Sequence, residues 1–456
     1  MTIEPELKSR LGEVMPGVIE DLARLIAIPS CAFPGFPAEP VMTMANATVE
    51  LLQRSGLPDA RLIDVPDGYP VVYGEIPAPP GAPTVLLYAH YDVQPAPPEQ
   101  GWTVDPWTPM VRDGRMFGRG AADDKSGIAV HAATLQALRS VYGENLPIGI
   151  RVIIEGEEET ASHLEGFVAA NPELFRADVF VIADGGNEEV GVPVLEVTTR
   201  GGVVLTVEVR TLEQPVHSGV FGGAAPDALM ALIHILATLH DDVGDVAVAG
   251  LRRGTWEGAE TSEDLFRRAG GLLPTTPLVG SGTLSSRLWS GPSINVIGLD
   301  AAPTATAVNA LAPAARAIVS LRTPPDADPE REREILIEHL KDAAPWGVQL
   351  DIVQAETWSG WSTSPDGPAI STAREAMTEV FGAPTNVIGS GGSIPLLNVL
   401  AEISPQAEFV LWGLSDAESS NLHSADESVD LDELRRIAES QVLFLSRLAG
   451  VVGASA

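Results

Sequence analysis

The spacing of apolar and polar residues predicts helices and strands that alternate along most of the chain. Helical spacing of apolar positions predicts helices at residues 5–28, 40–55, 126–138, 164–175 and 430–448, the last with Asp430 as its N-cap. Short apolar runs between Pro- and Gly-rich segments predict strands at residues 71–76, 84–89, 148–154 and 179–183. Strands that alternate with helices predict an α/β fold, with a mixed, mostly parallel sheet that is flanked by helices.

The pattern changes between residues 201 and 356. Period-two alternation predicts strands at residues 203–209 and 315–322, and helical runs lie around them at residues 225–239 and 329–343. A stretch rich in Gly, Ser and Thr at residues 254–293 belongs to the same part of the chain. These features predict a smaller α+β domain at 201–356, inserted into a larger domain that comprises residues 1–200 and 357–456.

Composition and charge exclude several classes of function. The chain has 456 residues and a formal net charge of −34, which argues against nucleic-acid binding and against an anionic membrane surface. No apolar run approaches the roughly 18–20 residues that span a bilayer, and the first residues, MTIEPELKSRLGEV, do not resemble a signal peptide. Cys31 is the only cysteine, so an intrachain disulfide is excluded, and we expect an inert thiol in a cytoplasmic protein.

Acidic and histidine side chains gather where the predicted strands end. These residues are His90, Asp92, Glu155, the run 157–159 and Asp184, with Asp123 and Asp124 directly before a predicted helix. A single carboxylate at such a position is more often a helix cap or a turn residue than a metal ligand. Four such segments together favour a functional site. Crowded carboxylates repel one another unless cations neutralise them, and imidazole with carboxylate suits zinc or manganese. Two ions that share a bridging carboxylate, with a neighbouring glutamate as general base, fit this number of ligands.

Seven motifs, in this order along the chain, carry a family resemblance. They are AHYDVQP, GRGAADDKSG, EGEEETAS, IADG, VHSGVFGG, GGSIP and NLHSADES. The chain resembles, from about residue 20 to about residue 445, the two-zinc metallopeptidases that include carnosinase-like dipeptidases, glutamate carboxypeptidase, aminoacylase and succinyl-diaminopimelate desuccinylase. It is most similar to the cytosolic dipeptidase branch. The resemblance implies a catalytic larger domain and an inserted domain that serves as a lid and as a dimerisation domain.

The resemblance also implies a ligand for each metal position. His90 and Asp184 match the ligands of one ion, and Glu159 and His423 match those of the other. Asp123 matches the carboxylate that bridges them. The expected cofactors are therefore two divalent ions per subunit, with zinc as the first choice and manganese or cobalt as alternatives.

Further residues match catalytic and substrate-binding positions of the family. Asp92 corresponds to the residue that orients the first metal-binding histidine, and Glu158 to the general base. His217 matches the lid histidine that, in family dimers, reaches the neighbouring subunit's site. Four residues match positions that contact the substrate or its carboxylate: Arg322, Asn309, Gly392 and Ser393. Trp358 or Trp361 is a candidate wall of an apolar subsite.

The resemblance implies hydrolysis of a peptide bond in dipeptides or similar small amides that bear a carboxylate. An N-acyl amino acid amidohydrolase or another deacylase on the same machinery is the nearest alternative. A dipeptidase needs an acidic group for the free amine, whereas a deacylase needs an apolar tunnel. A metal-binding protein without activity is disfavoured because Glu158 and all five ligand positions are present, and a phosphoesterase because no Gly-rich phosphate loop accompanies the carboxylates.

Several positions depart from the family pattern. Pro215-Val216 stand before the lid histidine where dipeptidases often carry Asp-Leu, and Gly389-Ser390 stand before GGSIP where many relatives have Arg-Glu. Ala161 replaces a glycine, and Asp426 stands where Asn is common. None of these changes removes an expected ligand or the base, so they bear on substrate specificity. The other histidines, His131 among them, are expected to be structural.

Overall fold

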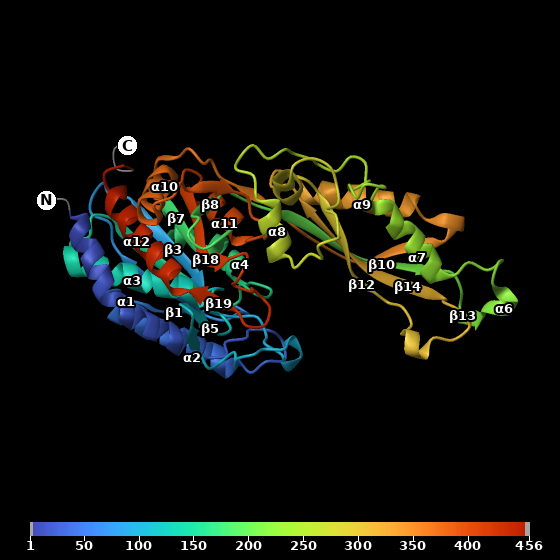
Figure 1. The fold of residues 1–456 in the computed structure, drawn as a ribbon, viewed down its shortest axis with the longest axis horizontal. Helices are drawn as coiled ribbons and strands as arrows, with labels where there is room; N and C mark the ends of the chain where they lie inside the picture. The colour runs from blue at the N-terminus through green and yellow to red at the C-terminus, as the bar shows by residue number, and fades with distance from the viewer. Residues whose placement is uncertain (1–2, 452–456) are drawn as a thin grey trace.

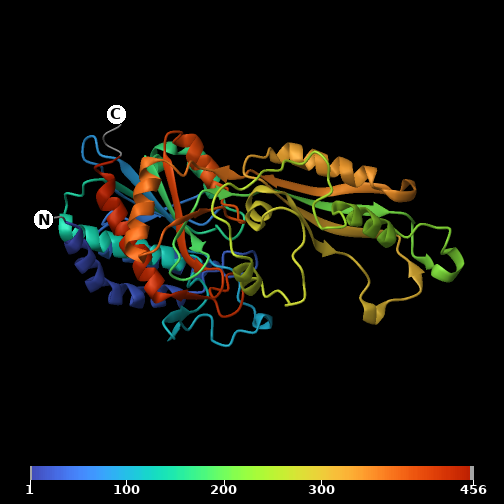
Figure 2. The ribbon, with the colours of Figure 1, turned by 45° about the horizontal axis from the view of Figure 1, so that its top comes forward.

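Two layered units, each built on its own sheet, lie end to end in the computed structural model, which describes residues 3–451 (Figure 1). The first unit holds both chain termini, and the second extends away from it as an elongated arm (Figure 2). The predicted α/β class is confirmed. The residue boundaries of the two predicted domains stay a prediction, although the sheet of the arm begins at Gly201 and ends at Trp358.

The first unit is organised around an eight-stranded mixed sheet in the order β1-β2-β6-β3-β7-β18-β8-β17. Its strands are β1 (Arg61–Ile63), β2 (Val71–Ile76), β3 (Thr84–His90), β6 (Gly149–Glu155), β7 (Val179–Asn187), β8 (Val194–Glu196), β17 (Asn386–Ile388) and β18 (Glu408–Asp416). The central strand β3 runs parallel to both β6 and β7, and β18 runs parallel to β7. The carboxyl ends of these four strands therefore meet at one edge of the sheet.

Helices cover both faces of this sheet. On β3, Val85, Leu87 and Ala89 belong to one hydrophobic core, and the alternate Leu86 and Tyr88 belong to the other. The first core is completed by α1 (Glu4–Ile26), α2 (Ala38–Arg54), α3 (Lys125–Tyr142), α10 (Pro368–Phe381) and α12 (Leu431–Leu448). The second is completed by α4 (Leu164–Ala170), α5 (Pro172–Phe175) and α11 (Leu396–Ile403).

Most of the helices predicted in this unit are confirmed, and one is corrected. Asp430 caps α12 as predicted, because its side chain accepts hydrogen bonds from the backbone N–H groups of Asp432 and Glu433. The helix predicted at 164–175 is instead two short helices. Asn171 lies between them with a non-helical backbone (φ −131°, ψ 51°), and Pro172 begins the second helix, where its missing N–H costs nothing.

The second unit is a four-stranded antiparallel sheet in the order β12-β14-β10-β15. Its strands are β10 (Gly201–Arg210), β12 (Ser293–Leu299), β14 (Ala314–Thr323) and β15 (Gln349–Trp358), with α7 (Ala228–Leu236) and α9 (Pro329–Asp342) packed against it. The predicted strands correspond to β10 and β14. The sequence did not predict β12 and β15, because most of their side chains are at least partly exposed and their apolar alternation is short. It is interrupted at Ile297 in β12 and at Val353 in β15, where the pairing register shifts.

Short elements complete the structure. The segment at 254–293 contains α8 (Glu263–Ala269) and a π-helical turn at Ser286–Ser290. The tip of the arm carries β11 (Val216–His217), α6 (Ser218–Phe221) and β13 (Ala310–Leu311). Smaller pairings use β4 (Met110–Arg112), β5 (Arg115–Phe117), β9 (Thr198–Thr199), β16 (Trp361–Ser362) and β19 (Ser428–Asp430).

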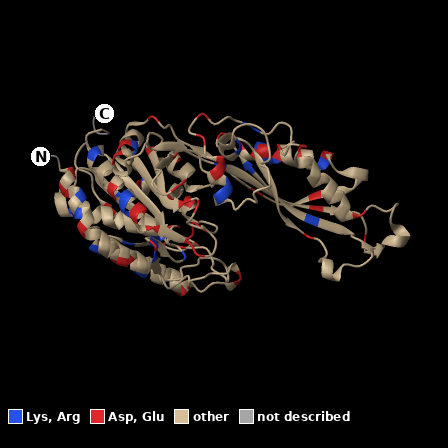
Figure 3. Ribbon diagram, in the orientation of Figure 1, with Lys and Arg blue, Asp and Glu red and all other residues tan. Residues whose placement is uncertain are grey.

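The structure shows where the acidic residues and the single cysteine lie. Acidic side chains are spread over the helices and loops of both units (Figure 3). Among residues 3–451, no helix combines the length and the apolar character needed to cross a membrane. Cys31 is buried, and burial raises the pKa of its thiol to about 11, which leaves it protonated and unreactive at neutral pH.

His131 on α3 is buried between the sheet and α12, as a structural histidine. Its Nε2 lies 3.0 Å from the Tyr88 carbonyl oxygen, and its Nδ1 lies 3.1 Å from Nε2 of Gln441. Burial lowers the pKa of His131 to about 4, whereas an unfolded histidine has a pKa of about 6.5. As the pH falls through this window, the unfolded state takes up a proton that the folded state excludes, so stability falls.

We therefore expect His131→Gln to flatten the pH dependence of stability. When the pH is lowered from 7 to 4.5, the unfolding free energy of the metal-free variant should fall by about 2 kcal/mol less than that of the metal-free unmodified protein. Each protein is compared with its own value at pH 7. Urea unfolding followed by circular dichroism at both pH values measures the difference. His163→Gln, which changes an exposed histidine of the same unit, is the control. Identical pH dependence in the protein and its His131 variant would contradict the assignment.

Candidate functional site

The candidate site lies where the parallel strands of the large sheet end. His90 is the last residue of β3 and is paired in register with Glu155, the last residue of β6. Asp184 lies in the final part of β7, and the loop after β6 carries Glu158 and Glu159. The strands run slightly further than the sequence predicted, so His90 and Asp184 are held by the sheet itself. Ligand sites of open α/β sheets occupy this edge.

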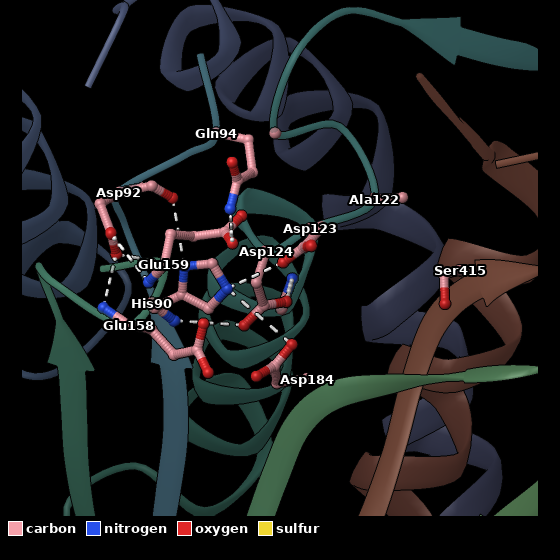
Figure 4. Close-up of polar contacts among 12 residues, drawn as sticks. His90, Asp92, Gln94, Ala122, Asp123, Asp124, Glu158, Glu159, Asp184 and Ser415 are labelled. Atoms are coloured by element: carbon pink, nitrogen blue, oxygen red, sulfur yellow. Dashed lines mark hydrogen bonds and ion pairs between the residues drawn. The ribbon is translucent and has the colours of Figure 1, made fainter. Parts of the chain in front are cut away.

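His90 is fully buried and is surrounded by carboxylates (Figure 4). Its Nε2 lies 2.9 Å from Oδ1 of Asp123 and 3.8 Å from Oδ1 of Asp184. Its Nδ1 faces Asp92, 3.1 Å from the carbonyl oxygen and 3.4 Å from Oδ1. The contact with the Asp92 carboxylate favours one orientation of the His90 imidazole ring, and we expected this role for Asp92.

Asp92 also holds the loop that carries the two glutamates. Its Oδ1 accepts the backbone N–H of Glu158 at 3.1 Å, and its Oδ2 accepts that of Glu159 at 3.1 Å. The side chain is completely buried, so these bonds are shielded from water. One carboxylate therefore fixes both the histidine at the end of β3 and the loop after β6.

His423 completes the cluster from the loop after β18. Its Nε2 lies 3.0 Å from Oδ2 of Asp123 and 3.3 Å from Oε2 of Glu159. Asp123 thus offers one oxygen to His90 and the other to His423, which is the arrangement that a bridging carboxylate needs. Gln94 supports the second group, because its Nε2 donates to Oε2 of Glu159 at 2.8 Å.

Two overlapping sets of side chains could each hold a metal ion. The ligand atoms of each set lie within 4.8 Å of one another, and the sets are His90, Asp123 and Glu159, and His90, Glu158 and Asp184. Nitrogen and carboxylate oxygen donors of this kind suit zinc and related divalent ions. The donor chemistry and the spacing of the side chains therefore fit a metal site.

Electrostatics support cations at this position. Burial and the nearby Glu158 raise the pKa of Asp184 well above its usual range. Burial also raises the pKa of Glu158 to about 8, with His90 opposing the change and Asp123 adding to it. Burial of Asp123 is outweighed by hydrogen bonds from His423 and His90, which lower the pKa of that carboxyl. A positive ion would relieve the mutual repulsion of these groups.

Sequence reasoning missed the buried Glu427, which positions the Asp123 loop. Its Oε2 lies 2.6 Å from Nη1 of Arg119, and its Oε1 accepts the backbone N–H of Asp123 at 3.1 Å. Asp124 was expected only to lie before the helix that became α3; it caps that helix and also accepts the backbone N–H of His90. Glu427 lies within the motif NLHSADES, so a signal was present, but its spacing does not reveal what it contacts.

Two of the expected substrate-binding residues meet at the base of the arm. Nη1 of Arg322, at the end of β14, lies 3.0 Å from Oγ of Ser393. Nε1 of Trp358 donates to the same oxygen at 2.8 Å, and the Arg322 guanidinium lies over the Trp358 ring. Gly392 is exposed beside them, and its N–H donates to Oγ of Ser390 at 3.2 Å. Trp358 is therefore near the expected carboxylate position.

The other expected residues lie elsewhere. His217 and Asn309 are exposed at the tip of the arm, at the opposite end of the molecule from the sheet that carries His90 (Figure 1). The Ser218 N–H donates to the Asn309 carbonyl oxygen at 3.0 Å, so the two segments are joined. Within one chain, neither residue reaches the carboxylate cluster. Trp361 is 5% exposed and packs against Phe409 in the core, so it does not line a subsite.

Comparisons with known proteins show which family and which proteins this chain is similar to. The sequence model of Peptidase family M20/M25/M40 matches residues 86–447. The chain is 40% identical over 370 residues to the cysteinylglycine-S-conjugate dipeptidase of Corynebacterium striatum, covering 80% of this chain and 81% of that protein. It is 28% identical to the Cys-Gly metallodipeptidase dug1 of Schizosaccharomyces pombe, covering 94% and 95%. The crystal structure of human carnosine dipeptidase 1 superposes on this chain with a TM-score of 0.83 at 24% identity, covering 99% of this chain and 100% of that one.

The sharing of Asp123 predicts different metal losses in different variants. Asp123 contacts both His90 and His423, so Asp123→Ala should abolish tight binding of both ions, whereas Asp184→Asn should leave about one zinc ion per chain. Metal analysis after dialysis against zinc, and titration against a chelating dye, measure the content and the affinity. His240→Asn, outside both sets, is the control. Two tightly bound ions in the Asp123 variant would contradict the assignment.

Proposed function

Because this chain belongs to peptidase family M20/M25/M40, we propose that it is a metal-dependent hydrolase that cleaves the peptide bond of dipeptides. The observation that carries the proposal is the sharing of the two Asp123 oxygens between His90 and His423, with Glu158 beside them. The names of two relatives, both dipeptidases, support the choice of substrate. Deacylation of N-acyl amino acids is the second candidate, which the same cluster would serve.

Five side chains would hold two divalent ions. We assign His90 and Asp184 to one ion and Glu159 and His423 to the other, with Asp123 between them. Zinc is the proposed metal, with manganese or cobalt as alternatives, because all three accept imidazole and carboxylate ligands. Bound ions of this kind supply Lewis acidity toward a carbonyl oxygen and toward a water molecule.

Glu158 is the proposed general base. Its backbone is fixed by Asp92, its side chain lies in the set with His90 and Asp184, and burial raises its pKa to about 8. A carboxylate that is fixed in this way can take a proton from the attacking water and deliver it to the amine that leaves. Asp92 acts through His90 and Glu158 as a positioning residue.

The arm provides the proposed substrate contacts. Arg322 and Ser393, joined by their 3.0 Å contact, would bind the substrate carboxylate, and the Gly392 N–H lies in the adjoining loop. His217 and Asn309 lie too far out on the arm to serve their own chain's site. We therefore propose a homodimer through the arm, in which these two residues complete the neighbouring site. Closure of the arm would exclude water from the substrate. A cytoplasmic location stays a prediction.

Replacing the base tests the reaction while preserving the metal site. Glu158→Gln should lower kcat for a dipeptide such as leucyl-glycine by about 10²- to 10⁴-fold, because proton transfer is lost. The two ions should remain bound, since Glu158 is not an assigned ligand. Steady-state kinetics and metal analysis of the same preparation measure both quantities. Unchanged kcat in a variant that carries two ions would reject Glu158 as the base.

A mixed dimer tests whether subunits share a site. Glu158→Gln and His217→Ala chains should each be inactive alone. Unfolded and refolded together, they form heterodimers in which one site contains an intact Glu158 and an intact partner His217, so about a quarter of the native activity should return. Differently tagged chains isolate the heterodimer for assay. A purified heterodimer with no activity would argue for sites built within one chain.

A further inference from the structure

A cavity of about 710 Å³ opens beside the carboxylate cluster and is lined by residues of both units. Asp123 and Asp184 contribute from the first unit. Leu265 and Phe266 of α8, together with Trp289, contribute apolar surface from the second. The cavity therefore combines a position for the reacting bond with an apolar wall, which is the composition of a small-molecule site.

The cavity is acidic. Among the described residues that line it there are acidic side chains but no Lys, Arg or His. The two aspartates of the cluster are assigned to metal ions, and Asp416 pairs with Nη2 of Arg115 at 2.8 Å. Glu188 and Glu196 are the remaining carboxylates, and no ion pair of either is found within residues 3–451. A lining of this kind is complementary to a positively charged part of a ligand.

Glu196, the last residue of β8, is the more deeply placed of the two, with 7% of its surface exposed. Its Oε1 accepts the Gly186 N–H at 3.2 Å and lies against Gly185, where a Cβ would come within 3.1 Å of it. It therefore lies against the two residues that follow Asp184. Burial raises the pKa of Glu196 to about 7, and the Gly186 N–H and the Ser390 hydroxyl oppose this change. A bound cation would favour the ionised form.

We infer that Glu196 binds the free ammonium group of the substrate's first residue. The inference rests on the proposed function and selects between its two candidates, because an N-acyl amino acid has no ammonium group to offer. Two divalent ions would repel an ammonium group nearby, so its binding requires a carboxylate that the ions do not use. Glu196 meets this requirement: it lies beside Asp184 but outside both metal-binding sets.

The same cavity indicates which kind of side chain the first residue of the substrate carries. With the ammonium group at Glu196 and the peptide bond at the cluster, the side chain of that residue has Leu265, Phe266 and Trp289 within the same cavity. Burial of apolar side-chain surface against these residues favours a bulky apolar group over hydrogen. The substrate class is therefore a dipeptide with a free amine and a bulky apolar first residue.

A pair of substrates that differ only in the amine tests the inference. Leucyl-glycine and 4-methylpentanoyl-glycine share one skeleton, and only the first has the ammonium group. Glu196→Gln should lower kcat/KM for leucyl-glycine by about 10- to 100-fold, as expected for a buried charged hydrogen bond, and should leave the analogue unchanged. Glu189→Gln removes the same charge from a residue that pairs with Arg268 and does not line the cavity, so it is the matched control.

Binding of leucyl-glycine is measured by calorimetry in the Glu158→Gln background, where hydrolysis is slowed, and it should weaken by the same factor when Glu196→Gln is added. Equal hydrolysis of both substrates by the unmodified protein would overturn the inference and leave a deacylase. The inference would also be overturned if Glu196→Gln lowered kcat/KM equally for both substrates. The same holds if only Glu188→Gln lowered kcat/KM selectively for leucyl-glycine. Absence of turnover in the metal-loaded protein, with the binding difference intact, would instead reject the proposed function and keep the ammonium site.

Discussion

The site depends on one shared carboxylate. Asp123 contacts His90 through one oxygen and His423 through the other, although these histidines are more than 300 residues apart in the sequence. That sharing holds only if the Asp123 backbone is fixed, and Glu427 fixes it by accepting its N–H while pairing with the buried Arg119. The loop that carries His423 also carries Glu427. The C-terminal part of the chain therefore both supplies a candidate ligand and positions the bridging one.

Asp92 has the corresponding role on the other side of the cluster. By facing His90 and accepting the N–H groups of Glu158 and Glu159, it links the ends of two neighbouring parallel strands. The proposed base and a proposed ligand are adjacent in sequence and held by the same carboxylate. Their side chains nevertheless join different sets: Glu158 faces Asp184, and Glu159 faces His423. A fixed backbone with diverging side chains allows one loop to serve two functions.

The sequence predicted the parts of the fold that depend on local pattern. Apolar runs located β3, β6 and β7, and because parallel strands end at one edge of a sheet, the grouping of His90 with Asp184 followed. The more exposed strands β12 and β15 were missed, because a one-residue bulge interrupts the apolar alternation of each. Only the family resemblance pointed to His423, since no periodicity links it to the strands. The role of Glu427 depends on backbone contacts across the fold, which residue types do not specify.

The net charge of −34 comes from two groups of acidic residues that differ in their surroundings. Most of the acidic side chains are at least partly exposed to solvent, where they favour solubility. The cluster is different, because Asp92, Asp123, Glu158, Glu159 and Asp184 are packed together and would meet two divalent ions. Five negative charges then face four positive ones, which leaves little attraction for a further cation. The ammonium group of a substrate therefore needs a protein carboxylate that binds no metal ion. Glu196 is buried against the residues that follow Asp184, and it gives the acidic cavity a selectivity for amines that surface charge cannot provide.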